Sequence, residues 1–287
     1  MRFEITRKEL QNDALAETLD ALYQAYKEIN ARLYLVGAAA RDICLMLLNS
    51  QDAPRKTMDL DVAVALKEWG EYDRLTEILI GQGFEKGKQK QKFYYGLKGM
   101  ALKYEVDIVP FGALAENETV AWPPEGSPVM SVRCFEDVMR ASDYVTVDGR
   151  FSFHVASLPG QWLIKLDAWE DRHLLTRKDA SDMMFLMENA YVLLALASES
   201  IPEEVNVDAA SFDLTVAGAE WIASELSRIL TREHRSYYSD LILREVSLAV
   251  SSRLINDLYD HSRTSSFESV LNGLRSMAKI LANKLQE

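Results

Sequence analysis

The chain has 287 residues, 48% hydrophobic and 26% charged, which is the composition of a globular protein with one large domain or two. Its net charge of −12 argues against non-specific binding of nucleic acid over the whole surface but leaves room for a local basic patch. The first residues do not form a signal peptide, no apolar run approaches the roughly 18 residues of a membrane span, and Cys44 and Cys134 lack metal spacing. We therefore expect a cytoplasmic protein with no membrane partner.

The first half of the chain alternates short apolar runs with longer segments of helical spacing. The predicted elements, in order, are a helix over 7–30, a strand over 32–37, a helix over 38–48, a strand over 57–66, a helix over 67–80, a hairpin of 91–97 and 101–109 around Lys98-Gly99, and the strands YVTV and FSFHVA around Asp148-Gly149.

From Leu158 onward every predicted element is a helix. These helices are expected over 158–173, 176–197, 209–230, 236–261 and 265–285. The change near residue 156 divides the chain into a mixed domain, 1–156, and a helical domain, 157–287. The predicted fold class is α+β: a mixed sheet with flanking helices, followed by an all-helical domain.

Two carboxylates, Asp59 and Asp61, stand one residue apart at the start of the apolar strand TMDLDVAVAL. Side chains alternate along a strand, so both point to the same face, although aspartate is depleted in strands and like charges repel. One explanation is a solvent-facing strand surface. The other is a divalent cation, which prefers hard oxygen ligands held a few ångströms apart.

Two further stretches carry related chemistry. In Val36–Asp42, VGAAARD, small residues at a strand-to-helix junction let a phosphate approach backbone N–H groups at a helix N-terminus. In the later strand YEVDIVP, Asp107 lies between apolar neighbours, where an isolated acid is costly unless it is paired or binds metal. Three strand carboxylates beside such a turn indicate a two-metal site for phosphoryl or nucleotidyl transfer.

The order G-A-x-x-R-D, then D-L-D, then V-D-I-V-P resembles the DNA polymerase β-type nucleotidyltransferase superfamily. Lys165–Arg172, followed by Lys178–Asp182, resembles the K-L-x-A-x-x-x-R and K-D-x-x-D signature of its AbiEii-type branch, whose members are toxins of toxin–antitoxin pairs or related transferases. The resemblance covers roughly residues 32–195. It implies a catalytic domain with the polymerase-β-like mixed sheet and a helical domain that contributes nucleotide contacts.

The resemblance also implies site residues. Asp59, Asp61 and Asp107 would be catalytic and would bind Mg²⁺ or Mn²⁺, and the residues contacting an NTP would be Gly37, Ala38, Arg41, Lys165, Asp179 and Asp182. The chain departs from the superfamily in two ways. Ala38 stands where Gly or Ser is usual, so a hydroxyl contact is missing, and the spacing from Gly37 to Asp59 is longer than usual.

Several of these residues have structural alternatives. Arg41 could contact phosphate or pair with Asp107. Lys165 lies in the apolar helix segment WLIKL, where a lysine usually extends its ammonium group to solvent. Asp179 and Asp182, three residues apart on one helix, either orient Lys165 or Arg172 or belong to a solvated helix face.

Lysines occupy every second position of a short segment, Lys86, Lys88, Lys90 and Lys92. In an extended segment they would share one face and could follow a nucleic-acid backbone. The simpler explanation, which we favour slightly, is an edge strand that lysines keep soluble.

The expected function is a Mg²⁺-dependent transfer of an NMP from an NTP to a tRNA or a protein hydroxyl. An AbiEii-like toxin of this kind would have an antitoxin protein as a partner. The alternatives are a small-molecule nucleotidyltransferase resembling those that act on aminoglycosides, and a non-catalytic binding protein that retains the fold.

Overall fold

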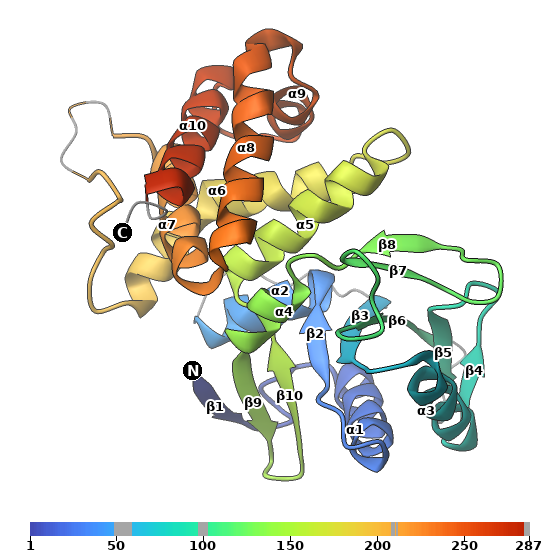
Figure 1. Ribbon diagram of the computed structural model, residues 1–287. Coiled ribbons are helices and arrows are strands. Elements are labelled where there is room, and N and C mark those ends of the chain that lie inside the picture. Colours follow the sequence, from blue (N-terminus) through green and yellow to red (C-terminus); the bar gives the residue numbers. More distant parts are fainter. Residues whose placement is uncertain (49–58, 97–102, 208–209, 211, 284–287) are drawn as a thin grey trace. The chain divides into compact units, whose positions relative to one another are not determined.

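The computed structural model describes residues 1–48, 59–96, 103–207, 210 and 212–283. The chain divides into two compact units, Met1–Ser157 and Leu158–Glu287. The first unit contains a mixed sheet with flanking helices, and the described part of the second contains helices without strands (Figure 1). The predicted α+β fold class is therefore confirmed.

Eight strands form the main sheet of the first unit, in the order β1-β9-β10-β2-β3-β6-β5-β4. Their bounds are β1 (Arg2–Ile5), β2 (Tyr34–Val36), β3 (Asp59–Ala65), β4 (Phe84–Lys86), β5 (Lys92–Gly96), β6 (Lys103–Phe111), β9 (Asp143–Val147) and β10 (Phe151–Val155). The central pair β3 and β6 is parallel, whereas β2 and β5 run antiparallel to these neighbours.

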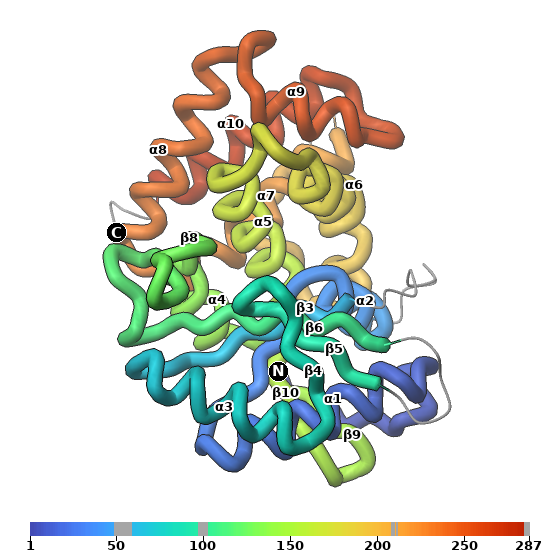
Figure 2. The backbone as a smooth tube through the Cα atoms, turned by 90° about the vertical axis from the view of Figure 1, so that its right-hand side faces the viewer, coloured from blue at the N-terminus to red at the C-terminus, as the bar shows by residue number. Residues whose placement is uncertain are grey.

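Helices and a small second sheet complete this unit. They are α1 (Asp13–Glu28), α2 (Gly37–Leu47), α3 (Trp69–Gly81), α4 (Phe135–Arg140) and the two-stranded sheet of β7 (Thr119–Ala121) and β8 (Val129–Ser131). Helices α1 and α3 lie side by side (Figure 2). Asn12, which caps α1, donates a hydrogen bond from Nδ2 to the Tyr104 hydroxyl at 3.1 Å, so Tyr104 points to the face of the sheet that α1 covers.

The helical unit comprises α5 (Leu158–Arg172), α6 (Lys178–Ala197), α7 (Leu214–Ile229), α8 (Arg232–Leu248), the 3₁₀ helix η1 (Ala249–Ser251), α9 (Arg253–Asp260) and α10 (Phe267–Asn283). Its core is formed where α7 packs against α6 and α10 and where α10 packs against α8. Apolar side chains such as Trp221, Ile222 and Leu274 are completely or almost completely buried there.

Three predicted helices have wrong bounds, in each case because a side chain caps the helix at another residue. The helix expected over 7–30 begins only at Asp13, since the Asn12 side chain accepts a hydrogen bond from the Leu15 N–H. The helix expected over 209–230 begins only at Leu214, since the Asp213 side chain accepts hydrogen bonds from the N–H groups of Thr215 and Val216. The helix expected over 236–261 is two helices, because Ser252 caps α9 in the same way. The predicted turn Lys98-Gly99 and the strand start Thr57-Met58 lie outside the described residues, whereas β5 and β6 pair as the expected hairpin.

Candidate active site

Strand register brings the predicted catalytic acids onto one face of the central sheet. Asp61 of β3 lies beside Asp107 of β6, and Asp59 lies beside Glu105 two residues earlier on the same strands. Residues two apart on a strand share a face, so these four side chains project from the same side. We call Asp59, Asp61, Glu105 and Asp107 the carboxylate cluster. Tyr104 is offset by one position from Glu105, so the cluster lies on the face opposite to α1.

The turn after β2 meets the cluster at Asp61. Gly37, the first residue of α2, has φ +70°, and a Cβ atom placed on it would lie 2.1 Å from Asp61 Oδ2. The carboxylate therefore occupies the space next to the α carbon of Gly37, and only glycine fits there. Val36, the N-cap of α2, has no side-chain acceptor, and the first turn of α2 contains no acidic residue. The positive end of the helix dipole thus faces the Asp61 carboxylate.

A lysine of the neighbouring strand also enters the cluster. Lys92 of β5 lies beside Asp107 in the antiparallel register. Its ammonium nitrogen is 3.6 Å from Asp107 Oδ1 and forms a hydrogen-bonded ion pair with Glu105. We predicted no role for Glu105, and we predicted Lys92 only as a member of the alternating lysine run, not as a partner of these carboxylates. The alternation in Tyr104-Glu105-Val106-Asp107 could have identified Glu105, because it places Glu105 on the face of Asp107.

The carboxylate cluster has the donor atoms that a hard divalent cation prefers, but its side chains do not converge on one point in this structure. In the parts of the chain that the structure describes, no three or more His, Cys, Asp or Glu side chains converge as a ready-made metal site. The donors are nevertheless of the right type, since carboxylate oxygens on one face of adjacent strands are the ligands that Mg²⁺ and Mn²⁺ prefer. The residues therefore fit such an ion if Asp107 turns from Lys92 toward Asp59 and Asp61.

The remaining residues of the turn lie in α2. Ala38 is the second residue of α2 and is half-buried. Arg41 forms an ion pair with Asp42, with 3.3 Å between Nη2 and Oδ1. Asp107 Oδ1 lies 3.6 Å from Lys92 Nζ, and the pairing of Asp107 with Arg41 stays a prediction.

The lysine run does not form an extended strand. Lys86 ends β4, Lys92 begins β5, and the chain turns between them with a hydrogen bond from Gly87 N to Lys92 O of 2.7 Å. Lys90 pairs with Glu125 at 3.2 Å, and Lys92 points into the carboxylate cluster. The four lysines thus do not line one face, because a hairpin turn interrupts their alternation.

The predicted residues of the helical unit form an ion-pair cluster of their own. Lys165 Nζ lies 2.8 Å from Asp182 Oδ2 and 3.3 Å from Asp179 Oδ1, and Arg172 donates two hydrogen bonds of 2.8 Å to Asp179. The Asp179 side chain is 1% exposed. Burial alone would raise the pKa of Asp179, but the hydrogen bonds from Arg172 and the charges of Lys165 and Arg172 outweigh burial and hold its pKa below the ordinary value.

Replacing Asp179 should destabilise the helical unit. We expect Asp179→Asn to lower the free energy of unfolding by about 1.5–3 kcal/mol, because the charge-assisted hydrogen bonds from Arg172 are lost while Lys165 keeps Asp182 as a partner. Asp182→Asn is the matched control, since Asp182 is 29% exposed and its loss should have a much smaller effect. Urea denaturation of the three proteins measures the difference, and equal stabilities would contradict this role of Asp179.

The same substitution should change the pH dependence of stability. The pKa of Asp179 is lower in the folded protein than the ordinary value of 3.8, so the unfolded chain binds more protons on acidification. Its stabilising contribution is present above 3.8 and is lost as the pH falls through the lower folded pKa. The free energy of unfolding of the parent should therefore decrease more steeply than that of Asp179→Asn in this range.

Helix α6 is long and apolar enough, by length and composition alone, to cross a membrane, and 39% of its most apolar window is buried. This is weak evidence for a membrane span, since core helices of soluble proteins have the same properties. In the helical unit α6 packs against α5, α7 and α9, and it contains the buried Asp179. This packing is that of a core helix.

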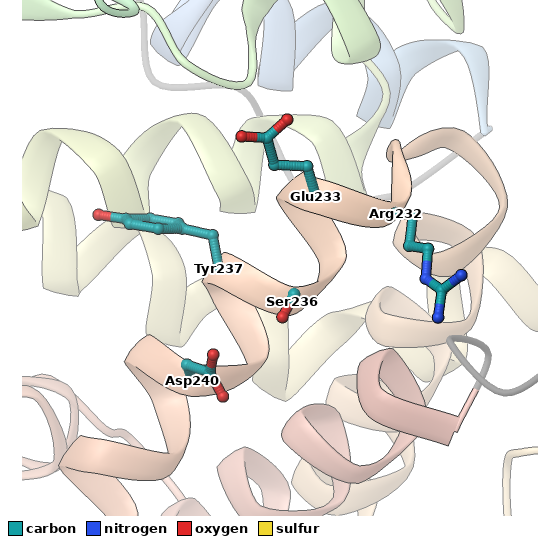
Figure 3. A pocket seen from close by; sticks show the side chains of 5 residues that line it. All are labelled: Arg232, Glu233, Ser236, Tyr237 and Asp240. Atoms are coloured by element: carbon teal, nitrogen blue, oxygen red, sulfur yellow. The ribbon is translucent and has the colours of Figure 1, made fainter.

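A pocket in the helical unit lies apart from these predicted residues. Its lining consists of Arg232, Glu233, Ser236, Tyr237 and Asp240, which all come from the first turns of α8 (Figure 3). The Tyr237 hydroxyl donates a hydrogen bond to Glu170 of α5. None of the residues predicted for metal or nucleotide binding lines this pocket.

Comparison with known proteins gives distant likenesses. No protein-family model matches the chain, and no curated protein matches it. Among solved structures it is similar to an antigenic nucleotidyltransferase-like protein from Paracoccidioides brasiliensis, at 18% identity and a TM-score of 0.41, over 78% of this chain and 93% of the other. It is also similar to a CCA-adding enzyme in complex with ATP, at 12% identity and a TM-score of 0.31, over 92% of this chain and 67% of the other. TM-scores below 0.5 establish neither activity nor substrate.

Proposed function

We propose that this protein is a metal-dependent nucleotidyltransferase that moves an NMP from ATP or another NTP to an acceptor and releases pyrophosphate. The observation that supports this most directly is the strand register, in which Asp61 lies beside Asp107 with Asp59 on the same face, next to the Gly37 turn. Carboxylates on adjacent strands beside a helix N-terminus combine ligands for a divalent cation with backbone donors for phosphate.

In this mechanism Asp59, Asp61 and Asp107 would hold Mg²⁺ or Mn²⁺. A bound ion of this kind supplies charge neutralisation to the triphosphate and lowers the pKa of an attacking hydroxyl. Asp107 would also accept the proton of that hydroxyl. Gly37, Ala38 and the start of α2 would direct N–H groups at the phosphates, and Arg41 would add a cation.

The role of the helical unit rests on the motif resemblance. Lys165 would contact the triphosphate, and Asp179 and Asp182 would hold its ammonium group in position through their ion pairs. A lysine that two carboxylates hold loses less side-chain freedom when it binds an anion than one that is free to move. The resemblance also suggests an AbiEii-like toxin of the cytoplasm, with tRNA or a protein hydroxyl as acceptor and an antitoxin as partner.

The direct test is an incubation with NTPs labelled at the α-phosphate, Mg²⁺ and total RNA, followed by detection of label in RNA and in protein. Label in RNA would identify RNA as the acceptor, and label in protein would favour a protein hydroxyl. If neither is labelled, a panel of hydroxylated small molecules, including aminoglycosides, is assayed by pyrophosphate release. Failure of all three, together with an absence of NTP binding, would contradict the proposal.

Lys165→Ala tests the helical unit. We expect the affinity for NTP to fall about tenfold or more, because a charge-assisted hydrogen bond contributes roughly 1.5–3 kcal/mol. Mn²⁺ affinity without nucleotide should stay the same. Lys279→Ala is the control, since Lys279 is an exposed lysine of α10 in the same unit and lies outside the motif. Unchanged NTP affinity in Lys165→Ala, measured by titration calorimetry, would make Lys165 a structural ion-pair residue only.

A further inference from the structure

Lys92 is an unusual residue within the carboxylate cluster. Its side chain is only 16% exposed, and lysines are rarely buried to this degree unless they are paired. Its partners are Glu105 and Asp107, which stand two positions apart on β6. One ammonium group therefore pairs with two carboxylates: Asp107, a predicted metal ligand, and Glu105, which has no assigned role.

The β4–β5 turn fixes the direction of this side chain. Lys92 N donates a hydrogen bond to Gln89 O at 3.1 Å, and Gly87 N donates one to Lys92 O at 2.7 Å. Gly87 also packs against the aliphatic part of the lysine, since a Cβ atom on Gly87 would lie 3.1 Å from Lys92 Cβ and 3.2 Å from Cγ. The Lys92 side chain therefore leaves a closed turn and has little freedom to point elsewhere.

A second ion pair on the same sheet provides a comparison. Lys103 of β6 pairs with Glu85 of β4, and their side chains are 45% and 64% exposed. Exposed pairs of this kind contribute little, because water screens both charges. Lys92 differs in burial and in having two carboxylate partners, so it acts inside the cluster and not on the open surface.

We propose that Lys92 is an internal counter-cation that competes with the divalent cation for Asp107. Without metal, it neutralises part of a cluster of four carboxylates that would otherwise repel one another. When the cation binds, Asp107 turns to it and Lys92 keeps its ion pair with Glu105. This inference rests on the proposed metal chemistry. It assigns a role to Glu105, which keeps the Lys92 ammonium group paired. Asp107 can then turn to the metal without leaving a buried, unpaired charge on Lys92.

Mn²⁺ binding to the full-length protein without nucleotide tests the competition, with free Mn²⁺ measured by electron paramagnetic resonance. In Lys92→Met the aliphatic part remains but the competing charge is gone, so Mn²⁺ should bind about five- to tenfold more tightly than to the parent. In Lys92→Arg the net charge is unchanged, but a planar guanidinium can hold both carboxylates more firmly. Mn²⁺ should therefore bind several-fold more weakly to Lys92→Arg.

Thermal unfolding separates this competition from a general effect of charge. Without metal, Lys92→Met should unfold at a lower temperature than the parent, and saturating Mn²⁺ should shrink this deficit, since the ion replaces the lost lysine. Lys103→Met removes the same charge from the same face and should show neither effect.

The outcomes distinguish the two proposals. If the parent binds Mn²⁺ but Lys92→Arg and Lys92→Met bind it with parental affinity, the competition is wrong while the metal site stands. If Mn²⁺ affinity rises equally in Lys103→Met and Lys92→Met, the competition is also wrong, because the loss of any positive charge near the cluster would then explain the result. If the parent binds no Mn²⁺, the proposed metal chemistry fails, and the competition fails with it. Lys92→Arg decides the question if Lys92→Met does not fold.

Discussion

Asp61→Asn should abolish nucleotidyl transfer while leaving the protein folded. Asp61 lies beside Asp107 in the strand register, and its carboxylate lies against the Gly37 turn, so it adjoins both a second predicted metal ligand and the expected phosphate donors. We expect activity to fall by at least about 10³-fold, equivalent to roughly 4 kcal/mol of transition-state stabilisation, because a metal ligand is lost. Asp59→Asn should have an effect of similar size.

Glu85→Gln is the matched control for these substitutions. Glu85 is a carboxylate at the edge of the same sheet, but it pairs with Lys103 and lies outside the carboxylate cluster. Its replacement should leave transfer unchanged. The variants are compared by label transfer with Mg²⁺, by Mn²⁺ binding and by thermal unfolding. Full activity in folded Asp61→Asn or Asp59→Asn would disprove the metal-dependent mechanism.

Gly37→Ala should have the second large effect, on stability as well as on activity. The alanine Cβ would lie 2.1 Å from Asp61 Oδ2, which is far inside van der Waals contact, and the residue would have to keep a φ of +70°. The left-handed conformation costs about 1–2 kcal/mol and the overlap about 1–3 kcal/mol more, so we expect a loss of roughly 2–5 kcal/mol in the free energy of unfolding.

A control glycine and a second substitution separate strain from overlap. Gly149 has φ +64°, but nothing lies within 4 Å of a Cβ placed there, so Gly149→Ala measures backbone strain alone. In the double variant Gly37→Ala/Asp61→Ala the overlapping oxygen is absent, and part of the lost stability should return. Urea denaturation compares the four proteins. If Gly37→Ala is no less stable than Gly149→Ala, Asp61 does not occupy the space beside Gly37.

The sequence was most informative where short-range periodicity determines geometry. Alternation along the strands predicts that Asp59 and Asp61 share a face, and the apolar neighbours of Asp107 predict a strand. Which strands are adjacent, and in what register, depends on pairing between distant segments. For this reason the match of Asp61 with Asp107 could be expected only from the resemblance.

Lysines were interpreted least well, because a long side chain finds its partner through tertiary structure. The alternation of Lys86 to Lys92 indicates an extended segment, but Gly87 and the following residues form a turn that sends Lys92 into the cluster. For Lys165 the contact with Asp182 was one of two alternatives, and the sequence could not decide between them, because the two residues lie 17 positions apart and meet through the packing of α5 against α6.

The topology of the main sheet also has a consequence for synthesis of the chain. The hairpin that carries Lys92 and Asp107 is nearly local, with Gly96 opposite Lys103, whereas β1 pairs with β9 through Arg2 and Tyr144. At about 5–20 residues per second, β1 is made roughly 7–28 seconds before its partner strand exists. During that interval its backbone N–H and C=O groups can pair with any other exposed strand edge. The strands that bear the carboxylates can pair before β9 is made. The growing chain is nevertheless more exposed to aggregation than the finished protein, because β1 has no partner strand until then.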